Sequence, residues 1–365
     1  MTRVDFRLLT ADFTAGFIHM APLRWRVAKF FAFSAFPTIP LLAPLGFYVD
    51  VPWLTPAVVL IGIPVSDFML RKDESGPFGR GASEATIAWL HLIPYLYVLV
   101  WAGTLAWALL VLQINEIPRP TVAWLILSVS IGSAFATCAA HELLHWPEAS
   151  ARAVARLVMA TVAYGHFPIE HLNHHVTLGL TSGGTTPLIG QSVWSFLVSN
   201  AVFSFRSAWR TERRRHCGKS LPLLRNRFVQ QLFLTSLMLI VFTSVAGTLG
   251  LLLFILQAAS GIYTTEYVNY AQHYGLSRVS EAPLSGRLSW SSNAFATNAA
   301  TLNITRHADH HLRAGVRYYD LEHMEGVPLL PAGYLALFIP AMIPPLWRRL
   351  MDKRASLFTK DHQQQ

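Results

Sequence analysis

Long apolar runs separated by short polar turns are the dominant pattern of this 365-residue chain. A helix needs about 20 apolar residues to cross a bilayer. The last run is too long for one crossing, and Gly247 and Gly250 in "VAGTLG" can supply a turn within it. The pattern predicts six membrane-spanning helices, near residues 29–48, 52–70, 86–112, 121–140, 229–247 and 250–268.

The six predicted helices pair into three hairpins, joined at "YVDVP", "QINEIPRP" and "AGTLG". The expected fold is a single all-α integral membrane domain over residues 1–365. A further apolar segment, "LLPAGYLALFIPAMIPPLW", contains Pro340, Pro344 and Pro345, which break helical hydrogen bonding. We expect this segment to lie on the membrane surface without crossing.

Composition and charge support a membrane location. Hydrophobic residues make up 53% of the chain and charged residues 13%, and the net charge is +9. The basic residues gather beside the apolar runs, which favours anionic lipid over nucleic acid as their partner. By the positive-inside rule, both termini and segments 141–228 and 269–365 face the cytoplasm, with a bacterial inner membrane as the expected location. The basic opening lacks a cleavable signal-peptide pattern, so we expect it to be retained.

Nine of the fifteen histidines fall into four groups. Within "HELLH", "EHLNHH" and "RHADHH" the rings are three or four residues apart, so they share a helix face. Such spacing suits a first-row metal, and imidazole binds zinc, copper, iron and nickel alike. Nine rings favour two ions over one, with the metal-binding parts in segments 141–228 and 269–330. The candidate ligands are His141, His145, His171, His174, His175, His273, His307, His310 and His311.

Other interpretations of these histidines explain less. "HELLH" also fits the HExxH pattern of zinc peptidases, with Glu142 as general base, but this leaves at least six histidines unused. A metal transporter would place its histidines at the membrane midplane, whereas these lie at or beyond the ends of the runs. Among the nearby carboxylates, Glu142 and Asp309 are expected to orient the rings or to bind an ion directly. For Glu170, solvation of a helix surface is an equal alternative.

The boxes "HELLH", "NYAQHYGL" and "RHADHH" resemble, in order, those of the membrane-bound alkane 1-monooxygenases. The related xylene-type monooxygenases and, more distantly, the acyl desaturases share this pattern. The likeness extends to "DFMLRKD" and to the C-terminal segment. It implies a di-iron centre held by the nine histidines and hydroxylation of an unactivated terminal carbon of a hydrophobic substrate with O2. Desaturation of a lipid or acyl chain at the same centre is the alternative.

Three positions depart from the family pattern. The second box usually reads EHxxGHH, whereas "EHLNHH" is one residue shorter, as in desaturases. Trp146 stands where lysine is usual, and Gln272 stands where glutamate is usual. These differences bear on substrate and outcome more than on the metal centre.

The source of electrons must lie outside the chain. Its two cysteines, Cys138 and Cys217, cannot form an iron–sulfur cluster or a zinc ribbon. The resemblance implies a rubredoxin or ferredoxin with its NAD(P)H-dependent reductase. The basic stretch 206–227 is a candidate docking surface for an acidic carrier, or a lipid contact.

Overall fold

The computed structural model describes residues 23–70, 72–114, 116–180, 184–217, 223–278 and 282–361. Within these ranges the chain is helical, and its one β contact is an isolated bridge between Ser291 and Leu329. Four helical runs are long and apolar enough to cross a membrane: Leu23–Tyr48, Glu84–Val111 (α6), Arg119–Leu144 (α7) and Arg227–His273 (α11). The predicted all-helical fold is therefore confirmed.

The N-terminal apolar segment forms two broken helical runs. The first consists of α2 (Leu23–Ala35), a 3₁₀ turn (Phe36–Leu41) and α3 (Leu42–Tyr48). Pro37 and Pro40 lie in the 3₁₀ turn and interrupt the α-helical hydrogen bonds there. The second run consists of α4 (Leu54–Ala57), a π-helical turn (Val58–Gly62) and α5 (Ile63–Met69). It is shorter than the span predicted at 52–70, reaching about 24 Å at 1.5 Å per residue.

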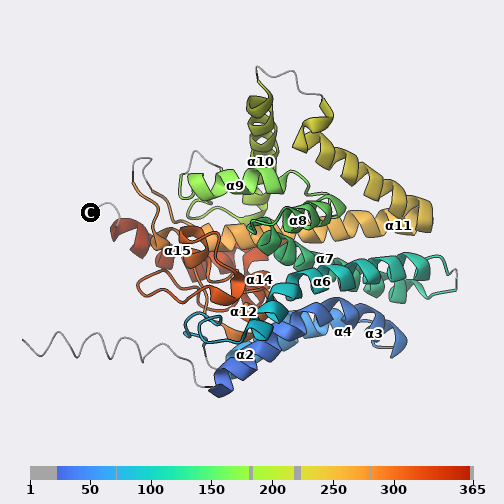
Figure 1. The fold of residues 1–365 in the computed structure, drawn as a ribbon, viewed down its shortest axis with the longest axis horizontal. Helices are drawn as coiled ribbons and strands as arrows, with labels where there is room; N and C mark the ends of the chain where they lie inside the picture. Colours follow the sequence, from blue (N-terminus) through green and yellow to red (C-terminus); the bar gives the residue numbers. More distant parts are fainter. Residues whose placement is uncertain are drawn as a thin grey trace, which may run out of the picture.

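Helices α6 and α7 correspond to the spans predicted at 86–112 and 121–140 and pack along each other (Figure 1). The Tyr97 hydroxyl donates to the Gly132 carbonyl at 2.7 Å, and the Trp101 indole donates to the Ser133 hydroxyl at 3.0 Å. Buried polar groups need such partners in an apolar environment. These bonds fix α7, which carries the first histidine box, against α6.

Helix α11 is a hairpin of two arms. Ala246 and Gly247 have non-helical backbone angles, and Gly247 has φ +56°, a conformation that favours glycine. A side chain at Gly250 would collide with the Phe242 carbonyl, and the Phe242 and Phe254 rings pack 5.5 Å apart across the arms. Figure 1 shows the second arm folding back beside α7. The predicted turn at these glycines is confirmed.

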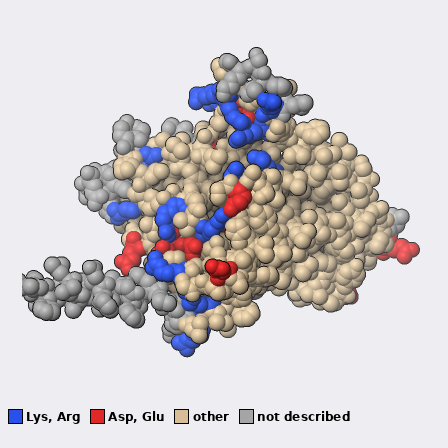
Figure 2. Space-filling view, in the orientation of Figure 1, with Lys and Arg blue, Asp and Glu red and all other residues tan. Residues whose placement is uncertain are grey.

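The remaining helices lie at one end of the molecule, beside it or projecting from it (Figure 1). They are α8 (Ala149–Thr161), α9 (Phe167–Thr177), α10 (Val193–His216), α12 (Phe295–Ala300), α13 (His307–Leu312), α14 (Tyr334–Met342) and α15 (Pro344–Asp361), with 3₁₀ turns at Leu223–Arg225, Gly286–Leu288 and Tyr318–Asp320. Lysine, arginine, aspartate and glutamate gather at this end in Figure 2, whereas the face over the far ends of α6, α7 and α11 is almost free of them.

Helix α14 lies in the proline-containing apolar segment near the C-terminus. It has nine residues and is too short to span a bilayer.

Candidate metal centre

Four separate elements bring the nine predicted histidines together. His141 lies in the last turn of α7 and His145 caps that helix, while His273 is the last residue of α11. The second and fourth boxes are helical as predicted, on α9 and α13. Rings distant in sequence become neighbours, with centroids 4.9 Å apart for His141 and His310.

The histidines form two groups of four. The first group is His141, His145, His171 and His310, and the second group is His174, His273, His307 and His311. Within each group, one nitrogen from every ring lies within 4.8 Å of the others. His175 lies between the groups, with its ring centroid 4.8 Å from His145 and 4.4 Å from His311.

The ring nitrogens converge as ligands of a shared cation do. In the first group, Nε2 of His145 lies 3.0 Å from Nε2 of His171. In the second group, Nε2 of His307 lies 3.1 Å from that of His273 and 2.8 Å from that of His311. Nitrogen ligands about 2.1 Å from a metal ion are themselves about 3 Å apart. The donor set therefore fits two metal ions.

Burial favours the neutral, metal-binding form of these rings. It lowers the pKa of His175 to about 4. Burial, with neighbouring histidines adding to it, also holds the pKa of His171 and of His311 well below the usual range. A neutral imidazole keeps a lone pair for a cation. The site is thus preset to bind a metal at neutral pH.

The three predicted carboxylates have different surroundings. Glu142 accepts hydrogen bonds from the Trp146 indole at 2.8 Å and the Tyr318 backbone at 3.0 Å. Asp309 accepts two hydrogen bonds from Arg313, at 2.5 and 2.6 Å. Their predicted role in orienting the rings remains a prediction. Glu170 is 5% exposed, so solvation of a helix surface does not explain it, and burial raises its pKa to about 8 with Glu266 contributing.

One ring is fixed by the backbone. Nδ1 of His273 lies 3.1 Å from the Leu288 carbonyl, which can only accept, so Nδ1 carries the proton. Nε2 is then left to bind a metal.

The two unusual residues beside the boxes have structural roles. The buried Trp146 indole donates a hydrogen bond to Glu142. The Arg317 guanidinium lies 4.0 Å from the centre of the Trp146 ring, and the centroid of the His91 ring lies 4.1 Å from that of Trp146. The Gln272 side chain donates to the Ile304 carbonyl at 3.2 Å, and the backbone carbonyl of Gln272 accepts from the Trp290 backbone N–H at 2.7 Å. Each departure therefore connects a histidine box to residues 290–318, the segment that contains the fourth box.

A buried ion-pair cluster holds the fourth box. Asp73 pairs with Lys29 at 2.9 Å and with Arg306 at 2.8 Å. Arg306 directly precedes His307 and also donates to the Ser75 carbonyl at 3.1 Å. Asp67 accepts from the backbone of Ala296 and Thr297 at the start of α12. The aspartates of "DFMLRKD" thus fasten the N-terminal segment to the metal-binding segment.

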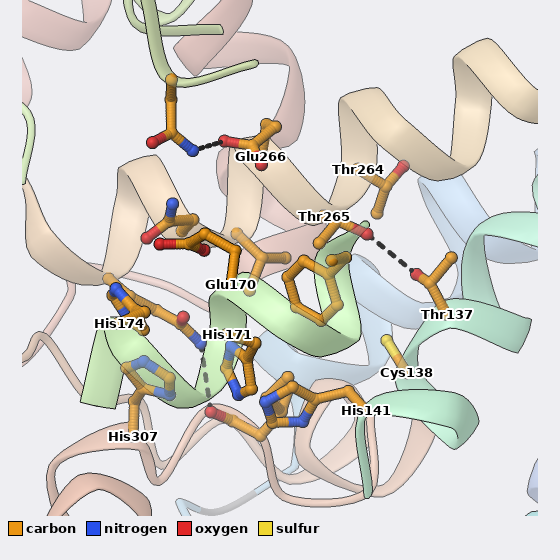
Figure 3. A pocket seen from close by; sticks show the side chains of 16 residues that line it. Thr137, Cys138, His141, Glu170, His171, His174, Thr264, Thr265, Glu266 and His307 are labelled. Atoms are coloured by element: carbon orange, nitrogen blue, oxygen red, sulfur yellow. Dashed lines mark hydrogen bonds between the residues drawn. The ribbon is translucent and has the colours of Figure 1, made fainter. Parts of the chain in front are cut away.

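A small cavity of about 40 Å³ adjoins both groups (Figure 3). Histidines from the boxes line one side, and Glu170 and Glu266 line another. Glu266, which is 1% exposed, was not among the residues predicted for the site. The sequence did contain a signal for Glu266: it is a lone carboxylate inside an apolar run, and ionisable residues within membrane-spanning segments usually have a function.

Comparison with known proteins places these features in context. Residues 118–341 match the fatty acid desaturase family. The chain is 32% identical to alkane 1-monooxygenase 2 of Pseudomonas aeruginosa, over 84% of this chain and 85% of that protein. It is 32% identical to alkane 1-monooxygenase 1 of Alcanivorax borkumensis, over 80% and 74% of the two chains. It is also 29% identical to the hydroxylase component of xylene/toluene monooxygenase from Pseudomonas putida, over 87% and 86%.

Proposed function

The chain belongs to the alkane 1-monooxygenases within the fatty acid desaturase family, and we propose that it hydroxylates an unactivated, terminal C–H bond of an alkane or alkyl chain with O2. The observation that carries this proposal is the pair of four-histidine groups beside a small cavity that shares wall residues with a larger apolar cavity among the helices. Its relatives named above are monooxygenases, which favours hydroxylation over desaturation.

The nine histidines would hold two iron ions, four in each group with His175 between them. Bound iron supplies the oxidising power that activates O2 toward a C–H bond. The protein's own contribution is to hold the rings neutral, to orient them and to keep bulk water away. Glu142, Glu170 and Asp309 support the boxes around these ligands, and the boxes lie in segments 141–228 and 269–330 of the single domain 1–365.

An apolar cavity of about 170 Å³ offers the substrate a route to the metal centre. It lies among α7, α11 and α14, and Phe135, Leu335 and Phe338 are among its walls. Cys138 and Thr264 line both this cavity and the one beside the histidines. An alkyl chain would enter from the membrane and meet the centre end-on, which matches attack at a terminal carbon.

The finer topology is also part of the proposal. Six crossings result if the two arms of α11 each cross the membrane and the short run Leu54–Met69 also crosses it. The other three crossings are the run α2–α3, α6 and α7. The histidine end, which carries most of the charge in Figure 2, then faces the cytoplasm of a bacterial inner membrane with both termini.

The electron donor is proposed to be a rubredoxin or ferredoxin with its NAD(P)H-dependent reductase. A wide hollow at the end of α10 is lined by Arg210, Arg213 and Arg214. It lies close to the second box, because Thr211 accepts a hydrogen bond from Asn173 of α9 at 2.8 Å. An acidic carrier docked there would be near the metal centre, and the part of this basic stretch at 218–222 lies outside the described residues.

Turnover under ¹⁸O₂ tests the proposal. Iron-loaded protein with a donor system is given alkanes, alkylaromatics and fatty acyl compounds, and products are analysed by mass spectrometry. We expect one labelled oxygen in a terminal alcohol. Loss of two hydrogens would instead identify a desaturase, and unlabelled products throughout would overturn the monooxygenase proposal.

A further inference from the structure

Glu266 is the centre of a buried polar cluster that the metal centre does not use. It lies on α11, two helical turns before His273, and faces the same cavity as His171, His174 and His307. The Asn200 side chain donates to its carboxylate at 2.5 Å, and Asn269 also hydrogen-bonds it. Figure 3 shows Glu170 between Glu266 and the labelled histidines.

A line of hydrogen bonds leads outward from Glu266. The Tyr164 hydroxyl donates a short hydrogen bond to the Glu266 carboxylate. The Ser204 hydroxyl hydrogen-bonds Tyr164 and lies 3.2 Å from Nε2 of His166. Tyr164 and Ser204 are 1% exposed, whereas His166 is only partly buried. The line therefore connects the surface between α9 and α10 to the cavity.

Every member of this line can both receive and release a proton. Imidazole, hydroxyl, phenol and carboxyl groups each carry a donor and an acceptor function in at least one protonation state. A merely structural polar cluster has no need of an unbroken series of such groups. Amides would satisfy Glu266 equally well, as Asn200 already does.

The proposed reaction requires protons at a closed site. It converts a C–H bond, O2, two electrons and two protons into C–OH and water. The carrier supplies the electrons, and the box histidines serve as metal ligands, so the protons have to come from outside the metal centre. Some path must bring the two protons from the solvent to the cavity.

We propose that His166, Ser204, Tyr164 and Glu266 form a proton relay that delivers these protons, an inference that rests on the proposed function. A proton arriving at His166 passes to the Ser204 oxygen, and the serine proton passes to the Tyr164 oxygen. The phenol proton moves to Glu266, which releases its proton into the cavity. Both delivered protons end in the water molecule formed from the second oxygen atom.

Tyr164→Phe and Glu266→Gln test the relay from two sides. A positioned proton donor contributes roughly 10²–10⁴-fold to a rate, and water can replace part of this. We expect each variant to lower kcat for O2 consumption by about tenfold or more, with iron content and substrate KM unchanged. The slowdown should be larger in D2O than for the unmodified enzyme. The double variant should be no slower than the slower single variant, because both changes interrupt one line.

Two further variants separate the relay from structural damage. Ser204→Ala removes the hydroxyl next to His166, at the end of the line that is farther from the metal-binding histidines. We expect the same lower rate and the same larger slowdown in D2O. Tyr263→Phe is the matched control, because its hydroxyl has no hydrogen-bond partner among the described residues, and it should behave as the unmodified enzyme.

The relay and the proposed function fail differently. If Tyr164→Phe and Ser204→Ala both consume O2 at the unmodified rate with an unchanged solvent isotope effect, the relay is overturned. Rate losses that multiply in the double variant would also overturn it. Absence of labelled alcohol from the unmodified enzyme would remove the proposed function instead, while O2 consumption would still report on the relay.

Discussion

The two histidine groups have the same number of rings but are held in different ways. In the first group His145 is partly exposed, whereas all four members of the second group are buried. The second group is fixed by the Leu288 carbonyl on His273 and by the Asp73–Arg306 pair before His307. The first group depends on Trp146 and Glu142, beside the guanidinium of Arg317, whose side chain is 18% exposed.

The two proposed iron sites should therefore not be equivalent. The second group has its ligands fixed before an ion binds, so it should bind more tightly. The first group has an edge open to solvent and should exchange its ion more readily. Substitutions at or near each group test this asymmetry, because they should affect the two ions to different degrees.

The largest difference is expected between His307→Ala and His145→Ala. His307 lies close to two neighbours of the second group, so its loss should release that ion and weaken the other. His145→Ala should release only the first ion. Iron per chain, measured by mass spectrometry of the metal, should fall from about two to well below one for His307→Ala and to about one for His145→Ala. Equal losses in both variants would contradict the asymmetry.

Asp73→Ala should be the next most damaging change. It leaves Lys29 and Arg306 buried without their carboxylate, and removing one partner of a buried ion pair costs about 3–5 kcal/mol. Thermal unfolding in detergent should shift down accordingly, and the second group should lose iron first. Asp50→Asn, at the exposed turn after α3, is the control: it removes a carboxylate, asparagine tolerates the positive φ of +57° there, and the unfolding temperature should stay in place.

The same ion pair predicts a pH dependence. Burial would raise the pKa of Asp73, but the Arg306 and Lys29 charges outweigh burial and hold it below the usual range. A carboxyl with a lowered pKa stabilises the fold above its unfolded pKa of about 4 and loses that effect as pH falls further. The free energy of unfolding measured below pH 4 should therefore decline less in Asp73→Ala than in the unmodified protein.

Trp146→Phe should affect the first group more mildly. It removes the indole donor from Glu142 and leaves a buried carboxylate oxygen less satisfied, which costs about 1–3 kcal/mol. Supporting residues around metal ligands are typically worth about 10–100-fold in affinity or activity. Chelator titration should show a weaker first iron and an unchanged second iron. Weakening of both to the same degree would argue against separate support.

Arg313→Gln should have the smallest effect. Its pair with Asp309 joins a half-exposed side chain to a buried one, and such pairs contribute about 0–1 kcal/mol. Iron content should be unchanged and the unfolding temperature nearly so. A loss of iron comparable to that of Trp146→Phe would show that Asp309 orients His310 or His311 through this pair.

The sequence predicted what is local and periodic. The helices, the turn at Gly247 and eight of the nine histidines could be read from apolar runs and from i, i+3, i+4 spacing, whereas His273 stands alone and its ligand role was implied by the family resemblance. The partners of Asp73 and Glu266 could not, because Arg306 lies 233 positions from Asp73 and Tyr164 lies 102 positions from Glu266. Such contacts depend on how helices pack, which no local pattern encodes. The shortness of Leu54–Met69 was missed because hydropathy alone does not reveal where a helix ends.

The spread of the ligands along the chain has a consequence for how the protein matures. Both groups draw on α9 and on α13, so the first group is complete only when residue 310, and the second only when residue 311, has left the ribosome. Most of the apolar helices are synthesised before that point and can insert without any ion. Iron loading should therefore be the last step of biogenesis, and a chain truncated before α13 should insert into the membrane but remain iron-free.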